Sequence, residues 1–540
     1  MDSPVGRLLM RLTGVGLLGV ALVALVAPRP VITPYRWPVV VASAIGLVLV
    51  ALVVRMPRWL VRGWVPPAVA VGGGVVTAAF GLAGQYAYGW DARVVMDLAR
   101  TLDSGQPLPA LGVDYFSLYP NNLPLLAIDE WGHAVARQAG LTADEVLIGL
   151  SAVCVAVTLY AVHDLVARVA GRGPALSAQL ATLVLVATSP WVAVPYTDLY
   201  AMPFVTGGAA LAARALAPGR REVRVVLWGL SILAMTVAYA LKTTPVVMVI
   251  AVAVTVLVAV FDGHQHLDRR AAGLAACAAG LVVFSALAVA VPTLAQDASG
   301  ADSSQLRADV SPSPLWWLAN GSNEKTSESG VTNYGTYSRE MVAAIEGRRP
   351  EQMDAYARAF LADRWAERGP VGTLAFYGNK LAWNWGDGMF SAWVEGADSL
   401  PGVMPPATGA VAVVQEVNGL HGRWYPLRAE LAQALWITVL LLAGVGLLRA
   451  PYRREIVLLA VTVLGIAAFT LLFQGRARYL FAFIPLVVAL AGMVHLWVPH
   501  LRRPRLRAVS DPRAGGTKVA GGTGGTGGTG GTGGTGRRLR

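Results

Sequence analysis

The sequence predicts an all-α polytopic membrane protein with about 12 transmembrane helices and two large extracytoplasmic loops. Hydrophobic residues make up 55% of the 540-residue chain and charged residues only 14%, whereas soluble proteins contain roughly 25% charged residues. The apolar residues also gather into runs of about 20, the length that a helix needs to cross a bilayer. This composition excludes a disordered chain and an ordinary soluble enzyme. The only two cysteines, Cys154 and Cys277, exclude a disulfide scaffold.

Each apolar run is expected to be helical because the bilayer interior offers backbone groups no water. The first run follows Arg7 and Arg11 as a secretory signal would, but no small-residue cleavage site follows, so we interpret it as a retained helix. The predicted spans are 8–27, 38–55, 66–85, 146–168, 176–194, 199–216, 224–241, 243–261, 271–293, 431–448, 454–473 and 479–498.

These spans and the polar segments between them divide the chain into six regions. They are N-terminal transmembrane helices (1–85), a first extracytoplasmic catalytic loop (86–145), a transmembrane core (146–293), a large extracytoplasmic loop (294–430), C-terminal transmembrane helices (431–498) and a disordered basic tail (499–540). The tail contains the Gly-Gly-Thr repeat Gly521–Gly536, which has nothing to bury and is expected to be flexible.

The formal net charge of +12 at first suggests a nucleic-acid partner. The arginines, however, cluster in alternate loops and in the tail, as in the loops after 38–55 and 199–216. By the positive-inside rule, this distribution places both termini in the cytoplasm of a multi-pass plasma-membrane protein. Topology therefore accounts for most of the positive charge, and no nucleic-acid partner is expected.

The two polar segments then lie outside the cytoplasm. Helical patterns are predicted at 90–102, 122–139, 338–347 and 350–368, and the aromatic, amphipathic stretch Leu374–Trp385 is expected in the membrane interface. The second segment holds seven of the sixteen tryptophans. They suit a membrane-interface belt or a folded site.

Asp91 lies near the start of the first polar segment, just past the end of the span 66–85 and among glycine and aromatic residues. A carboxylate in a partly buried turn can act as a general base toward a hydroxyl group. The alternative is a helix N-cap, since Asp91 precedes the helical pattern Ala92–Arg100.

Two further polar turns are candidate substrate contacts. In the turn Tyr119-Pro-Asn121-Asn122 the amide groups could hydrogen-bond a sugar, although capping of the helix 122–139 would explain one of them. Asp198 lies in a short outward turn between the spans 176–194 and 199–216, where a helix cap is again the alternative.

Three cations sit on the predicted outer side, against the positive-inside bias. Lys242 lies between the spans 224–241 and 243–261, and Arg476, Arg478 and the adjacent Tyr479 lie before the last span. The phosphate of an outer-leaflet lipid would supply the missing anion. The alternative is that these side chains extend to ordinary lipid headgroups.

Other chemistry has no sequence signal. We find no glycine-rich phosphate loop and no His/Cys cluster with metal-ligand spacing, so no metal ligand is predicted. The spans hold almost no charge at mid-membrane depth, unlike those of ion-coupled transporters.

The order of these motifs resembles that of the GT-C superfamily of integral-membrane glycosyltransferases. The motifs are the outward Asp91, the Tyr-Pro-Asn-Asn turn, the Tyr-Thr-Asp turn at Asp198, Lys-Thr-Thr-Pro from Lys242 and Gly-Arg-Ala-Arg-Tyr up to Tyr479. The likeness is closest to the bacterial branch related to protein O-mannosyltransferases and aminoarabinose transferases, family 39-like. The segments 320–340 and 380–388 also look like loops of that branch.

The resemblance implies a GT-C-like fold and a sugar transfer from polyprenyl phosphate at the outer face of the plasma membrane. The sugar would be a hexose such as mannose, and the acceptor an envelope protein, lipid or glycan. Asp91 matches the catalytic acid and would be the general base; Lys242, Arg476 and Arg478 would hold the phosphate. Many relatives carry two adjacent acids where this chain has Asp91-Ala92, which leaves a divalent cation in question. A lipid-linked sugar flippase or transporter and a non-catalytic envelope scaffold are the alternatives.

Overall fold

The computed structural model describes residues 3–29, 34–53, 56–57, 59–261, 267–326, 332–394 and 404–496. Within these ranges the chain is mostly helical, as predicted. Strands β1 (Glu324–Thr326) and β2 (Thr332–Tyr334) pair antiparallel, with Lys325 opposite Asn333. The predicted flexible tail, 499–540, lies outside the described residues.

Long apolar helices are the main structural elements of the described part of the chain. Nine helical segments of the described residues are long and apolar enough to cross a membrane. They are α1 (Pro4–Val26), α3 (Val65–Ala83), α7 (Ala143–Ala170), α9 (Thr197–Leu216), α10 (Arg221–Leu241), α12 (Leu267–Ala298), α17 (Tyr425–Arg449), α18 (Arg454–Leu472) and the run η6–α19–η7 (Ala477–Leu496).

The other three predicted spans are also helical but shorter. They form α2 (Trp37–Val53), α8 (Arg172–Thr182) with its π-helical continuation η2 (Leu183–Ala187), and α11 (Val246–Phe261). A multi-pass membrane architecture is therefore confirmed, and the number of twelve crossings stays a prediction. Large apolar side chains point outward from the long helices, as Val15, Val71 and Val282 do. Such exposure suits a lipid surrounding.

The helices pack closely through small residues. A Cβ atom on Gly74 of α3 would lie 3.0 Å from the Ala152 carbonyl oxygen of α7, so these backbones nearly touch. Ser231 of α10 donates a 2.9 Å hydrogen bond to the Gly208 carbonyl of α9. Small residues and hydroxyl groups typically bring membrane helices together because lipid provides little hydrophobic driving force between them.

Short elements fill the two polar segments. The first contains α4 (Trp90–Asp103), α5 (Ala110–Leu118), η1 (Pro120–Asn122) and α6 (Leu123–Ala139). Around the β1–β2 hairpin, the second contains η4 (Ser303–Gln305), η5 (Ala308–Val310), α13 (Pro314–Gly321), α14 (Arg339–Ala343), α15 (Pro350–Trp385) and α16 (Gly409–Asn418).

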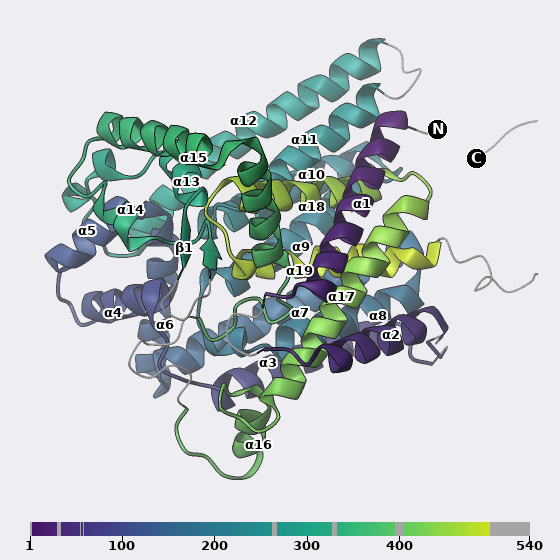
Figure 1. The fold of residues 1–540 in the computed structure, drawn as a ribbon, viewed down its shortest axis with the longest axis horizontal. Coiled ribbons are helices and arrows are strands. Elements are labelled where there is room, and N and C mark those ends of the chain that lie inside the picture. Colours follow the sequence, from purple (N-terminus) through teal and green to yellow (C-terminus); the bar gives the residue numbers. More distant parts are fainter. Residues whose placement is uncertain are drawn as a thin grey trace, which may run out of the picture. The chain divides into compact units, whose positions relative to one another are not determined.

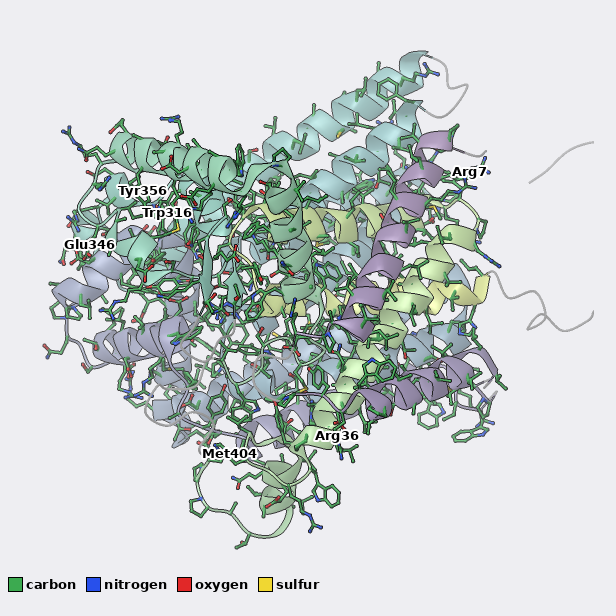
Figure 2. The ribbon with its side chains drawn as sticks, viewed as in Figure 1. Arg7, Arg36, Trp316, Glu346, Tyr356 and Met404 are labelled. Carbon is green, nitrogen blue, oxygen red and sulfur yellow. The ribbon has the colours of Figure 1, made fainter. Side chains whose placement is uncertain are left out.

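The two polar segments pack against each other. The Arg307 backbone N–H donates to Ser117 Oγ at 2.9 Å, and its guanidinium lies 2.7 Å from an Asp114 carboxylate oxygen. Figure 1 shows α4, α5 and α6 next to α13, α14 and α15. A separate small hydrophobic core joins α13, α14 and α15 around the fully buried Trp316. Figure 2 shows Trp316 and Tyr356 among these helices.

Details of the second segment differ from the prediction. Helix α14 ends at Ala343 rather than near residue 347. The predicted helix end near residue 368 is confirmed, because Gly369 (φ 60°) is non-helical and divides α15 into two helices, the second of which ends at Trp385. Trp316, Trp385 and Trp393 are buried inside the protein. A membrane-interface belt therefore cannot explain these three tryptophans, because their rings contact the protein interior.

Candidate functional site

Asp91 lies in the first turn of α4, directly after the loop that leaves α3. Gly89 is the N-cap of this helix, so the alternative prediction that Asp91 is the cap is wrong. Trp90 has a left-handed backbone (φ 57°), which is strained for a bulky residue. Strain of this kind persists only where the surrounding structure enforces it and is common at functional sites.

Two tyrosine hydroxyls point at the Asp91 carboxylate. Tyr115 of α5 donates to Oδ1 at 3.0 Å, and Tyr196 donates to Oδ2 at 3.4 Å. Asn122 donates from Nδ2 to the Tyr115 hydroxyl at 2.6 Å, and Asn121 donates to the Asn122 side chain at 3.3 Å. Asn122 makes no helix-capping hydrogen bond to α6, which removes the capping explanation for its side chain.

Both tyrosines are held in the neutral form. Burial, and next the Asp91 carboxylate, raise the pKa of Tyr115 well above its usual value. The same two causes raise the pKa of Tyr196. Each hydroxyl therefore remains a hydrogen-bond donor to Asp91 near neutral pH and orients the carboxylate.

A buried ionic cluster lies next to Tyr196. Asp198 is 3% exposed, and its Oδ1 accepts a hydrogen bond from the Lys242 ammonium at the end of α10. The Arg478 Nε lies 3.7 Å from Asp198 Oδ2. Tyr196 is the N-cap residue of α9, so Asp198 is not the predicted helix cap but the partner of two cations.

Aromatic rings surround these cations. The Arg478 guanidinium lies over the rings of Tyr196 and Trp191, 4.9 and 5.7 Å from their centroids. Lys242 lies 4.7 Å from the centroid of Tyr479. Cation–π contacts of this kind strengthen when desolvated.

Arg476 connects the cluster to the start of α4. Its guanidinium lies 4.7 Å from the centroid of the strained Trp90 ring, and the residue is 8% exposed. Lys242 and Arg478 are also enclosed, with side chains 10% and 6% exposed. The alternative that these three cations extend to bulk headgroups is therefore wrong, because ion pairs and rings hold them inside the protein.

The second polar segment reaches the site through Gln474. Asn320 donates to Gln474 Oε1 at 2.5 Å, and Gln474 donates from Nε2 to the Tyr479 hydroxyl at 3.0 Å. Tyr119 of the first polar segment contacts the second. Its ring centroid lies 5.4 Å from that of Tyr115, in its own segment, and 6.2 Å from that of Trp317, in the second segment.

All nine predicted site residues thus gather in one region, although they come from loops far apart in the sequence. Further residues of this region were not predicted as site residues: Trp90, Tyr115, Trp191, Tyr196, Trp317, Asn320 and Gln474. Tyr196 had a sequence signal, because it begins the Tyr-Thr-Asp turn, and Tyr115 lies four residues before the turn that holds the Asn pair. Among the residues that the structure describes, no group of three or more His, Cys, Asp or Glu side chains could hold a metal ion.

The fold and this region define an integral membrane protein with a cluster of buried polar and charged side chains at the ends of its apolar helices. The sequence model of one family, described as conserved hypothetical integral membrane protein, matches residues 74–496. The chain therefore belongs to that family. No curated protein and no solved structure matches the chain.

Proposed function

We propose that this protein is a GT-C-type glycosyltransferase that transfers a sugar, such as a hexose, from polyprenyl phosphate to an envelope acceptor. The site would face the outside of the plasma membrane, with both chain termini in the cytoplasm. One observation carries the proposal. Tyr196 touches a carboxylate with its hydroxyl and a buried guanidinium with its ring, so Asp91 and Arg478 lie on two sides of one residue.

This arrangement suits both halves of a sugar transfer. The acceptor O–H would give its proton to Asp91 while its oxygen attacks the anomeric carbon. The bond from that carbon to the phosphate oxygen breaks, and polyprenyl phosphate leaves with the electron pair. Lys242, Arg476 and Arg478 would stabilise the negative charge that grows on the phosphate, as positioned cations do in a site that excludes water.

In this proposal, Asp198 is the counter-ion of two of the buried cations. Buried cations are costly without a counter-ion, and Asp198 supplies one to Lys242 and Arg478 before the donor arrives. Three cations and two carboxylates, Asp91 and Asp198, leave an excess of positive charge in the region. That excess suits an incoming lipid phosphate.

The chemistry can be tested with purified protein in proteoliposomes. We expect the protein to consume a polyprenyl-monophosphate hexose and to release polyprenyl phosphate once envelope extract supplies the acceptor, as measured by thin-layer chromatography of a labelled donor. Movement of intact donor across the bilayer, with no release of polyprenyl phosphate, would instead identify a flippase and contradict the proposal.

Donor binding should weaken as the pH rises through about 8. Burial lowers the pKa of Lys242 to about 8, so the ammonium form that attracts phosphate is lost above that pH. We expect KM for the donor to rise between pH 7 and pH 9, by roughly the tenfold that one charge-assisted contact of about 1.4 kcal/mol provides.

The matched variants are Lys242→Arg and Lys242→Met. The arginine stays charged over this range, so its KM should not rise between pH 7 and pH 9. The methionine variant should have a raised KM at every pH and no pH dependence from this group. A wild-type pH profile in both variants would exclude Lys242 as the titrating group.

A further inference from the structure

Three arginines line one pocket where α1 begins and α17 ends. Helix α1 contributes Arg7, Met10 and Arg11, and the end of α17 contributes Arg449 beside Leu447 and Leu448. The following turn, 450–452, completes a cavity of about 280 Å³. Figure 2 shows Arg7 at the N-terminal end of α1, far from Arg36 near the start of α17.

Helix packing explains why the pocket opens here. Gly14 and Gly444 meet where α1 and α17 cross, and a Cβ atom on either would lie 3.0 Å from the carbonyl oxygen of the other. Arg7, Met10 and Arg11 lie on the same face of α1 as Gly14, at spacings of three, four and seven residues. The two backbones are thus close at the glycines, and larger side chains line the space toward the helix ends.

Tyr452 closes the pocket beside Gly6. A Cβ atom on Gly6 would lie 2.3 Å from the Tyr452 ring, so only glycine lets the ring approach α1 so closely. Among the described residues that line the cavity, three are arginines and none is acidic. The remaining wall is apolar, so the pocket combines guanidinium groups with a surface for hydrocarbon.

This pocket and the Asp91 region lie at opposite ends of α18. That helix begins at Arg454, just after the turn that lines the pocket, and ends at Leu472, four residues before Arg476. Its 19 residues span about 28 Å at the rise of an α-helix, roughly the thickness of a bilayer core. The two regions therefore face opposite leaflets.

We propose that the α1–α17 pocket binds the phosphate of an anionic phospholipid from the leaflet in which α1 begins. Arginine forks match phosphate oxygens in geometry and charge, and basic pockets between membrane helices recognise anionic headgroups. Leu8, Leu12 and Val15 are exposed along α1 next to the pocket. They offer an apolar path for the acyl chains, which a soluble phosphate would not use.

Lipid retention tests the proposal. The full chain is reconstituted in vesicles of equal parts phosphatidylcholine and phosphatidylglycerol, extracted gently, and its bound lipids are counted by native mass spectrometry. We expect wild type to retain phosphatidylglycerol preferentially. The triple variant Arg7→Gln, Arg11→Gln, Arg449→Gln should reduce that preference by roughly 100-fold, the combined contribution of three basic residues near an anionic lipid.

The control replaces three exposed arginines that do not line the pocket: Arg172→Gln, Arg220→Gln and Arg221→Gln. Retention like wild type in the control and loss in the pocket variant supports a specific site. Equal loss in both variants, or no preference in wild type, overturns it. Displacement of the lipid by inorganic phosphate alone would show a soluble-phosphate site and also overturn it. Gel filtration and thermal unfolding confirm that each variant is folded.

Discussion

Replacing Asp91 by asparagine is expected to lower the rate of sugar transfer by roughly 10²- to 10⁴-fold, the contribution of a positioned general base. Asparagine has the same shape, and its Oδ1 can still accept the hydrogen bond that Tyr115 donates at 3.0 Å. The site geometry should therefore persist while the proton acceptor is lost. The measurement is the initial rate of polyprenyl phosphate release at saturating donor.

Asp97→Asn is the matched control because it makes the same change on the same helix. The Asp97 side chain is 46% exposed, and Arg93 donates to it at 2.8 Å. Such surface pairs contribute little, so transfer should remain near the wild-type rate. Donor binding by Asp91→Asn should also be retained, since Lys242, Arg476 and Arg478, the cations proposed to hold the phosphate, are untouched. A variant that is folded, binds donor and transfers at the wild-type rate would exclude Asp91 as the base.

The sequence was most informative about the membrane helices. Within the described residues, each of the twelve predicted apolar segments forms a helix. A long apolar run predicts a helix well because the bilayer interior offers backbone groups no water. Helix ends were less accurate. Helix α14 ends at Ala343 although its predicted pattern continues to residue 347, whereas the predicted end near residue 368 coincides with the non-helical Gly369 (φ 60°) that divides α15 into two helices.

The site was predictable as a set of residues but not as a set of contacts. Asp91, Asp198 and Arg478 each stood out by their position in a short polar turn. Their pairing depends on how α4, α9 and the last helical run meet in space, which local sequence does not encode. For that reason capping was a reasonable alternative for Asp198, whereas the structure places two cations on its carboxylate.

One buried lysine links this site to the second polar segment. Lys380 of α15 is fully buried, and its ammonium donates to three backbone carbonyls: Gly321 at 2.5 Å, Leu471 at 2.8 Å and Phe473 at 2.8 Å. These carbonyls end α13 and α18, where helical partners run out. A cation is the favourable partner at such ends. Lys380 therefore caps two helices at once, just before Gln474 and the segment that carries Arg476 and Arg478.

Replacing Lys380 by methionine is expected to lower the free energy of unfolding by roughly 3 kcal/mol or more, because three buried acceptors lose their donor and each costs about 1–3 kcal/mol. The measurement is denaturant unfolding in detergent. Lys325→Met is the control: Lys325 is exposed, lies in β1 and pairs with Glu340 at 2.8 Å, so its loss should cost at most about 1 kcal/mol.

Because the capped end of α18 leads directly into Arg476, the rate of transfer by Lys380→Met should fall even at denaturant concentrations below its unfolding transition. Equal stability of the two variants would show that water or a shifted backbone satisfies the three carbonyls, and Lys380 would then have no special part in holding the site.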